Sequence, residues 1–260
     1  MGSQPQLVLP PITDPAMREQ IARLARRHVE AGGLGMEIMS MVGNSAENLI
    51  ERLPAFVRNR LDRMTRIALS RAFSAASGSR RMMRDRGDLF NRMASTVSGA
   101  AGGAAGLPGA VVELPFTVTL LLRAMLDIAA EHGLDPESEE VRKECLRIFA
   151  AAGPMEEDDG TDLGLLAARM TVTGQTVQGL ISKVAPRLSV SLGQKLAAQS
   201  APVFGAVVGA SINFTFARYY QEIARVHFGL LRLSRETGMP HEALVEALRI
   251  EIAHLGGRRA

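Results

Sequence analysis

Four polar side chains stand out because they lie in or beside stretches with hardly any charge. Glu113 is the only charged residue between Arg92 and Arg123. A carboxylate in such surroundings is costly unless it is paired, solvated or protonated. One hypothesis is therefore a polar centre for a ligand or a reaction, built from Glu113, Arg123, Asp127 and Asn213.

Two interpretations of these residues stay open. In an enzyme, Glu113 would be the general acid or base, with Arg123 and Asn213 as substrate contacts, and a solvent-reachable cavity would be required. Alternatively, Glu113 is a first-turn residue favoured by the helix dipole. Arg123 and Asp127, one helical turn apart, would then form a simple intrahelical pair.

Signatures of metal and cofactor chemistry are missing from the sequence. There is no HExxH motif, no paired CxxC motif and no cluster among the five histidines. The glycine-rich stretch from Gly99 to Gly109 lacks the Lys-Ser/Thr pair of a phosphate-binding loop. The acidic stretch 156–162 lacks EF-hand spacing and is expected to be a solvated loop. No metal and no cofactor are therefore expected, and a non-enzymatic protein is favoured.

Two uncharged stretches, 93–112 and 196–216, must position the polar residues. In the second, Gly205 and Gly209 share a helix face with Asn213, and the first contains glycines at the same spacing. Such glycines let another backbone approach closely, and each costs up to about 1 kcal/mol relative to alanine inside a helix. We therefore predict a central helix pair that touches through its glycine faces, formed by Gly99, Gly102, Gly103, Gly106, Gly205 and Gly209.

The length of these two stretches leaves their environment open. Each is about as long as a bilayer span, roughly 20 residues, so the pair could form a soluble core or a membrane-seeking hairpin. Aromatic residues make up only 4% of the chain and tryptophan is missing, which counts against an integral membrane protein.

Arginine is concentrated between residues 52 and 92. This segment holds eleven arginines and three aspartates, a net charge of +8, and no lysine. Such a block suits an anionic partner, either phospholipid headgroups or an acidic protein face, and without a recognition motif nucleic acid is not favoured. The alternative is a solvated helix face. The residues expected to contact an anionic surface are Arg58, Arg60, Arg63, Arg66, Arg80, Arg81 and Arg84.

The lone cysteine and the N-terminus favour a cytoplasmic location. Cys145 excludes an internal disulfide and lies in an amphipathic helix, which predicts a buried, inert thiol. Residues 1–11 have neither the basic nor the apolar region of a secretory signal.

Helix signals occur along the whole chain and strand signals are almost absent, so an all-α bundle of about nine to eleven helices without a sheet is expected. Asp14-Pro15 should begin the first helix, and Gly32-Gly33 should end it. A break is expected at Leu107-Pro108-Gly109, and Gly133 should stop the following helix. We divide the chain into an N-terminal helical arm, 1–92, and a helical domain, 93–260.

Several motifs resemble the signature of the EcsC family, a bacterial family named for a gene beside an ABC transporter. They cover about residues 97–238 and comprise Gly106-Leu107-Pro108-Gly109, Glu113-Leu114-Pro115, 121–129, 194–199, 202–209 with Asn213, and His227-Phe228 with Leu231-Arg232-Leu233. Leu231 and Ser234 depart from the charged residues expected near His227. The resemblance implies a helical cytoplasmic or membrane-associated protein and brings no established activity.

These observations favour a non-enzymatic protein that associates peripherally with the cytoplasmic membrane face and binds lipid or an apolar ligand. The alternative is a soluble accessory protein that binds a transporter component or another protein partner. An enzyme that uses Glu113 is the least favoured.

Overall fold

The computed structural model describes residues 10–42, 50–82, 106–150, 176–199 and 205–257. These ranges form eight α-helices and one short 3-10 helix and contain no strand, so the all-α prediction is confirmed. The count falls slightly short of the nine to eleven helices expected, for the described part of the chain. None of the helices in these ranges is both long and apolar enough to cross a bilayer.

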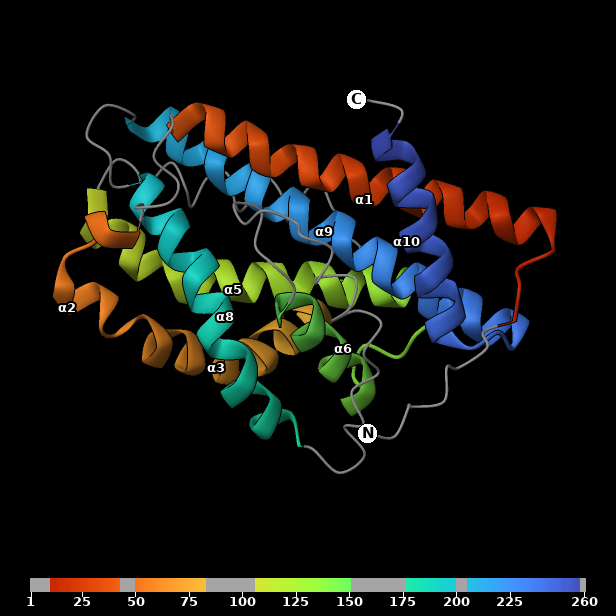
Figure 1. The fold of residues 1–260 in the computed structure, drawn as a ribbon. Helices are drawn as coiled ribbons and strands as arrows, with labels where there is room; N and C mark the ends of the chain where they lie inside the picture. Colours follow the sequence, from red (N-terminus) through yellow and green to blue (C-terminus); the bar gives the residue numbers. More distant parts are fainter. Residues whose placement is uncertain (1–9, 43–49, 83–105, 151–175, 200–204, 258–260) are drawn as a thin grey trace, which may run out of the picture.

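The helices pack side by side around α9 and α5 (Figure 1). Helix α1 packs along α9, α5 lies between α9 and α3, α8 contacts α3, α5, α6 and α9, and α10 covers α1 and α9. The elements are α1 (Pro15–Val42), η2 (Ile50–Arg52), α2 (Ala55–Arg58), α3 (Leu61–Met82), α5 (Gly106–Glu131), α6 (Glu139–Ala150), α8 (Val177–Gln199), α9 (Gly205–Thr237) and α10 (His241–Gly257).

Local capping chemistry sets several helix ends where the sequence predicts them. The Ala16 backbone N–H donates to the Asp14 carboxylate at 3.0 Å, which caps the start of α1. Gly133 adopts a φ of 73° directly after α5, the left-handed conformation expected of a helix stop. Ser138, which accepts a hydrogen bond from the Val141 N–H at 3.2 Å, caps the start of α6.

Two predicted helix breaks are wrong. Helix α1 continues through Gly32-Gly33 to Val42 because Ala31 and Leu34, on either side of the pair, are buried in the core. Helix α5 includes Pro108, which lies in its first turn, where a missing N–H loses no intrahelical bond. Tertiary packing thus outweighs the local signal at the glycine pair.

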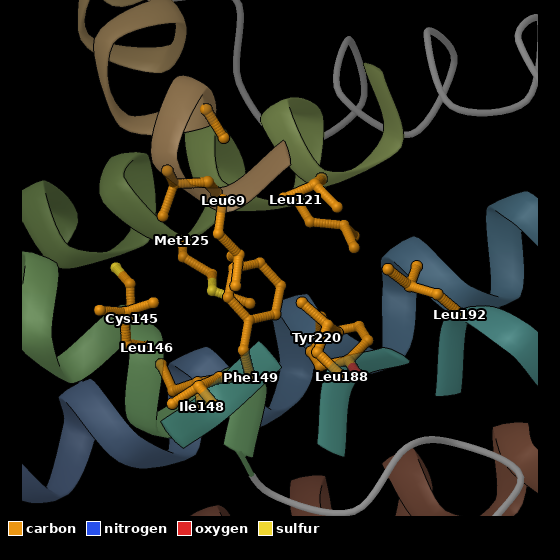
Figure 2. Close-up of a cluster of buried hydrophobic side chains, with 14 of the residues drawn as sticks. Leu69, Leu121, Met125, Cys145, Leu146, Ile148, Phe149, Leu188, Leu192 and Tyr220 are labelled. Carbon is orange, nitrogen blue, oxygen red and sulfur yellow. The ribbon is translucent and has the colours of Figure 1, made fainter. Parts of the chain in front are cut away.

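The main core joins both ends of the sequence. Figure 2 shows part of it, where Leu69 of α3 meets Met125 of α5, Phe149 of α6 and Leu188 of α8. Tyr220 of α9 closes the cluster, its ring 5.5 Å from that of Phe149 between centroids. Cys145 is a free thiol buried in the same cluster, as expected. Residues of α1 and α3 therefore share one core with the later helices, and the proposed boundary at 92/93 lies outside the described ranges.

A second, smaller core holds α1, α9 and α10 together. Its buried members include Ile21 of α1, Leu230 of α9 and Leu244 of α10. Gly229 permits the closest approach there, because a Cβ at this position would lie 2.8 Å from Leu24 Cδ2. Gly193 plays the same part between α8 and α3, where a Cβ would lie 2.9 Å from Leu61 Cδ1. The sequence analysis selected neither glycine.

The structure describes only part of the predicted glycine-faced helix pair. Helices α5 and α9, which carry Gly106 and Gly205, do contact each other. Gly99, Gly102 and Gly103 lie outside the described residues, as do the side-chain surroundings of Gly106, Gly205 and Gly209. Contact through the glycine faces therefore stays a prediction.

Candidate functional site

A buried polar centre forms where α5, α8 and α9 meet. Glu113 of α5 pairs with Lys195 of α8, with 3.2 Å between the carboxylate Oε1 and the ammonium Nζ. The same oxygen accepts hydrogen bonds from the Thr117 hydroxyl, at 3.0 Å, and from the Asn213 amide of α9. The exposed fraction is 7% for Glu113 and 0% for Lys195. One carboxylate oxygen thus connects three helices inside the core.

The protonation equilibria of the pair follow from burial and from the partners. Burial raises the pKa of Glu113, but the Lys195 charge and the hydrogen bonds from Asn213, Thr117 and Lys195 together hold that pKa below its ordinary value. Burial lowers the pKa of Lys195, and Glu113 offsets only part of this effect. The carboxylate is therefore charged at neutral pH, and its charge requires the ammonium beside it.

This arrangement suits an architectural role better than acid–base catalysis. A general acid or base must reach the substrate proton within hydrogen-bond distance, whereas Glu113 and Lys195 are enclosed by the packed helices that carry them. Breaking a buried ion pair by removal of one partner is strongly destabilising, so such a pair fixes how its helices fit together.

The structure divides the four predicted centre residues into two separate pairs. Asn213 and Glu113 are in hydrogen-bond contact. Arg123 and Asp127 form an ion pair within α5, with 3.7 Å between Nε and Oδ2. Ten residues of helix, about 15 Å, separate Arg123 from Glu113. A ligand-binding role for either pair stays a prediction.

Lys195 and Thr117 are the members of the buried polar centre that the sequence analysis missed. A signal for Lys195 exists, because it is the only charged residue between Arg187 and Arg218. Each uncharged stretch is thus bordered by one lone charge, Glu113 or Lys195, and the two have opposite signs. The pairing of two lone opposite charges in two packed stretches could have been predicted.

A second buried carboxylate lies between α6 and α9. Glu144 accepts from the His227 ring at 2.8 Å and also pairs with Arg147. Burial opposes ionisation, but the hydrogen bond and charge of His227, followed by those of Arg147, lower the pKa of Glu144 to about 2. His227 and His241 are both buried, with ring centroids 6.1 Å apart. His227 lies inside α9, whereas His241 is the first residue of α10.

The arginine-rich segment carries a set of exposed side chains on α2, α3 and the turn between them, here called the basic face. It combines two large exposed apolar side chains with three exposed arginines, in the order Phe56, Arg60, Arg63, Ile67 and Arg71. The exposed fraction is 65% for Phe56 and 46% for Ile67. Arg63, Ile67 and Arg71 share one face of α3 because they are spaced four residues apart. Arg60 lies at the start of this helix, where its carbonyl accepts from the Met64 N–H at 2.9 Å, and Phe56 lies on the preceding helix α2.

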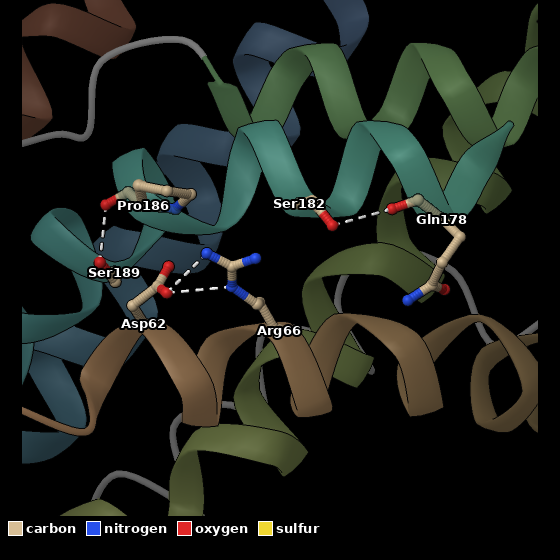
Figure 3. Close-up of polar contacts among 6 residues, drawn as sticks. All are labelled: Asp62, Arg66, Gln178, Ser182, Pro186 and Ser189. Atoms are coloured by element: carbon tan, nitrogen blue, oxygen red, sulfur yellow. Dashed lines mark hydrogen bonds and ion pairs between the residues drawn. The ribbon is translucent and has the colours of Figure 1, made fainter. Parts of the chain in front are cut away.

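The remaining predicted surface arginines differ in their surroundings. Arg66 donates twice to Asp62, at 2.8 and 2.9 Å, and Figure 3 shows both side chains on the side of α3 that faces α8. Arg58 is exposed on a different side of α2 from the basic face. Nothing is described for the side chains of Arg80 and Arg81, and Arg84 lies outside the described residues.

Within the described ranges, no acidic side chain pairs with the arginines of the basic face. Asp62, the one acidic residue of α2 and α3, is engaged by Arg66. The neighbouring helix α8 contributes exposed Lys183 and Arg187, and its sequence contains no acidic residue. Arg60, Arg63 and Arg71 thus lack an acidic partner among the described residues, whereas Arg187 donates to the Ala150 carbonyl at 3.2 Å.

In the described part of the chain, fold and sites together define an all-helical bundle with an ion-paired centre inside and a basic surface without acidic partners outside. Residues 79–233 match the model of the EcsC protein family, and this range is more than half of the chain. The chain belongs to the EcsC family, as its motifs had indicated. No curated protein and no solved structure matches it.

Proposed function

We propose that this protein binds reversibly to the anionic surface of a membrane through its basic face. The observation that carries the proposal is the occurrence of exposed Phe56 and Ile67 among exposed Arg60, Arg63 and Arg71, which have no acidic partner among the described residues. A single exposed apolar side chain is ordinary on a protein surface, so it is the combination of Phe56 and Ile67 with the neighbouring arginines that favours a membrane. Basic and large apolar side chains together are typical of helices that lie at a membrane interface.

The energies of the two kinds of residue are complementary. Each basic residue near an anionic leaflet contributes about 1 kcal/mol, and this contribution is screened by salt. Burial of an exposed phenylalanine or isoleucine in the acyl layer contributes about 1.5–3 kcal/mol and is not screened. Three arginines and two apolar side chains are enough for reversible recruitment, and we place the protein at the cytoplasmic face, where anionic lipids are exposed.

Vesicle flotation of the full chain tests this function. Vesicles of phosphatidylcholine alone are compared with vesicles that also contain phosphatidylglycerol, at about 50 and about 500 mM salt. We expect binding to the anionic vesicles only, with weaker binding at high salt. Failure to bind anionic vesicles at low salt would eliminate the proposal.

Two double variants with matched controls separate the charged from the apolar contribution. Arg63→Glu with Arg71→Glu should abolish binding, whereas Arg26→Glu with Arg235→Glu, at exposed positions of α1 and α9, should not. Phe56→Ser with Ile67→Ser should weaken binding roughly tenfold or more. Ile250→Ser, at a position of similar exposure on α10, should leave binding unchanged.

The same variants distinguish the second candidate, an accessory protein with an acidic protein partner. Such a partner would also select the basic face. In that case the charge reversal would remove the partner, and neither the wild-type chain nor the variants would float with vesicles.

A further inference from the structure

The positions of Arg60 and Arg63 point to a particular lipid headgroup as the ligand. This inference rests on the proposed membrane function. Arginine occupies all but three of the 30 basic positions of this chain, so the residue type alone says little. The positions are more informative. Arg60 lies at the cap position of α3 and Arg63 three residues further on, in its first turn; both are exposed. Exposed Phe56 and Ile67 precede and follow the two arginines in the sequence.

We propose that Arg60 and Arg63 form a two-guanidinium clamp for the phosphate monoester headgroup of an anionic phospholipid, of the kind that phosphatidic acid presents. Side chains three residues apart on a helix have Cβ atoms about 5–6 Å from each other. Two guanidinium groups that start from such positions can converge on a single phosphate. Each would donate a pair of parallel N–H bonds to phosphate oxygens.

Charge and surroundings leave this pair free for an external ligand. Asp62 lies on the α8 side of α3 and accepts hydrogen bonds from Nε and Nη2 of Arg66. Arg60 and Arg63 have no acidic partner among the described residues. Their mutual repulsion is therefore compensated by an external anion, and the anion with the higher charge compensates it better.

A monoester fits the pair better than a diester does. It offers three terminal oxygens and a charge between −1 and −2 near neutral pH, so two guanidinium forks can bind it at once with one oxygen shared between them. A diester such as that of phosphatidylglycerol offers two terminal oxygens and one negative charge, enough for a single guanidinium fork.

The apolar neighbours identify the source of the phosphate as a lipid. Phe56 and Ile67 precede and follow the arginine pair, so an anion bound there lies between two apolar side chains. In a bilayer, these side chains enter the acyl layer while the arginines stay at headgroup level. A soluble phosphate would leave both apolar side chains in water.

Flotation with two vesicle types at equal surface charge tests the clamp. One type contains phosphatidic acid and the other phosphatidylglycerol, each in phosphatidylcholine, with the surface potentials matched. We expect the full chain to bind the phosphatidic acid vesicles about fivefold more tightly. Arg60→Lys with Arg63→Lys keeps both charges but removes the planar forks. This variant should bind phosphatidylglycerol vesicles about as well as the wild type does and lose the preference, to less than about twofold.

Controls keep the outcomes distinct. Arg26→Lys with Arg235→Lys should retain the preference of the wild type. Equal wild-type binding to both vesicle types, or a preference that survives Arg60→Lys with Arg63→Lys, overturns the clamp but leaves the membrane function standing. Binding to neither vesicle type overturns both. Binding of inorganic phosphate alone, dependent on Arg60 and Arg63 and without flotation, would replace the lipid by a free anion.

Discussion

Lys195 and Arg63 are both cations on helices of the same bundle, yet their surroundings are opposite. The Lys195 ammonium is fully buried and lies 3.2 Å from the Glu113 carboxylate. Arg63 is exposed, and no carboxylate of the described residues pairs with it. The buried charge of Lys195 is matched by a carboxylate, whereas the arginines of the basic face have no acidic partner among the described residues. The first arrangement determines how helices fit together, and the second can only be satisfied from outside.

The largest effect is expected when one partner of the buried polar centre is removed. Lys195→Met leaves the Glu113 carboxylate buried without its cation, which should lower the free energy of unfolding by about 3–5 kcal/mol. Lys183→Met, on the exposed side of the same helix, should change it by less than about 0.5 kcal/mol. Urea denaturation of the two variants checks the contrast, and equal effects would contradict the assignment.

Removal of both partners of the buried polar centre sharpens this result. Glu113→Met with Lys195→Met replaces the pair by apolar side chains of similar length. Since a buried ion pair is often no better than well-packed apolar residues, the double variant should recover more than about half of the loss. A double variant as unstable as the sum of two single variants would show that each residue has a separate role.

A smaller effect, confined to acid, is expected at Glu144. Its pKa is lowered from 4.5 to about 2, so the folded state holds the charged carboxylate more strongly than the unfolded state does. Its stabilisation is therefore fully present above about pH 4.5 and is lost as the pH falls through about 2. It amounts to at most about 3 kcal/mol.

Wild type and Glu144→Gln should thus differ most above pH 4.5 and converge as the pH falls towards 2. Unfolding by urea, measured at intervals from neutral pH down to about pH 2.5, gives this difference directly. Glu139→Gln, at an exposed position of the same helix, serves as the control. A difference that does not change with pH would mean that Glu144 contributes by packing alone.

Replacement of glycine by alanine should also affect stability differently at a packed and at an open position, by about 1 kcal/mol. Gly32→Ala should stabilise the protein by about 0.5–1 kcal/mol, because it lies inside a helix and an added Cβ meets nothing within 4 Å. At Gly193, the same change brings a Cβ to 2.9 Å from Leu61 and should lose that gain. Thermal unfolding of both variants compares the two positions.

The smallest effect on stability is expected at the basic face itself. Arg63→Glu with Arg71→Glu should change the free energy of unfolding by less than about 0.5 kcal/mol while it removes vesicle binding. Thermal unfolding and flotation of the same protein preparation check both results. A large loss of stability would show that these arginines belong to the architecture after all.

The parts of the fold that depend on neighbouring residues were predictable from the sequence. Asp14 and Gly133 act within a turn of their own position, so their effects could be predicted from local chemistry alone. Gly32-Gly33 was misjudged because its outcome depends on the α1–α9 contact, and nothing in residues 15–42 reveals that contact.

The candidate site shows the same division. Glu113 could be found because a lone charge in an apolar stretch needs a partner, and Asn213 because it shares a face with two glycines. Lys195 was not connected with them, although it satisfies the same criterion, because the partner of a buried charge is set by the fold of distant helices. The basic composition of 52–92 was evident, but the alternation of arginine with exposed Phe56 and Ile67 required knowledge of the buried side.

The pairing of α1 with α9 has a consequence for biosynthesis. Arg27 of α1 meets Glu222 of α9 across 195 residues of sequence. During translation at about 5–20 residues per second, the apolar side of α1 therefore waits on the order of ten seconds or more before its partner is made. Throughout that interval Met17, Ile21 and Ala25 remain uncovered, which makes the nascent chain a natural client for chaperones.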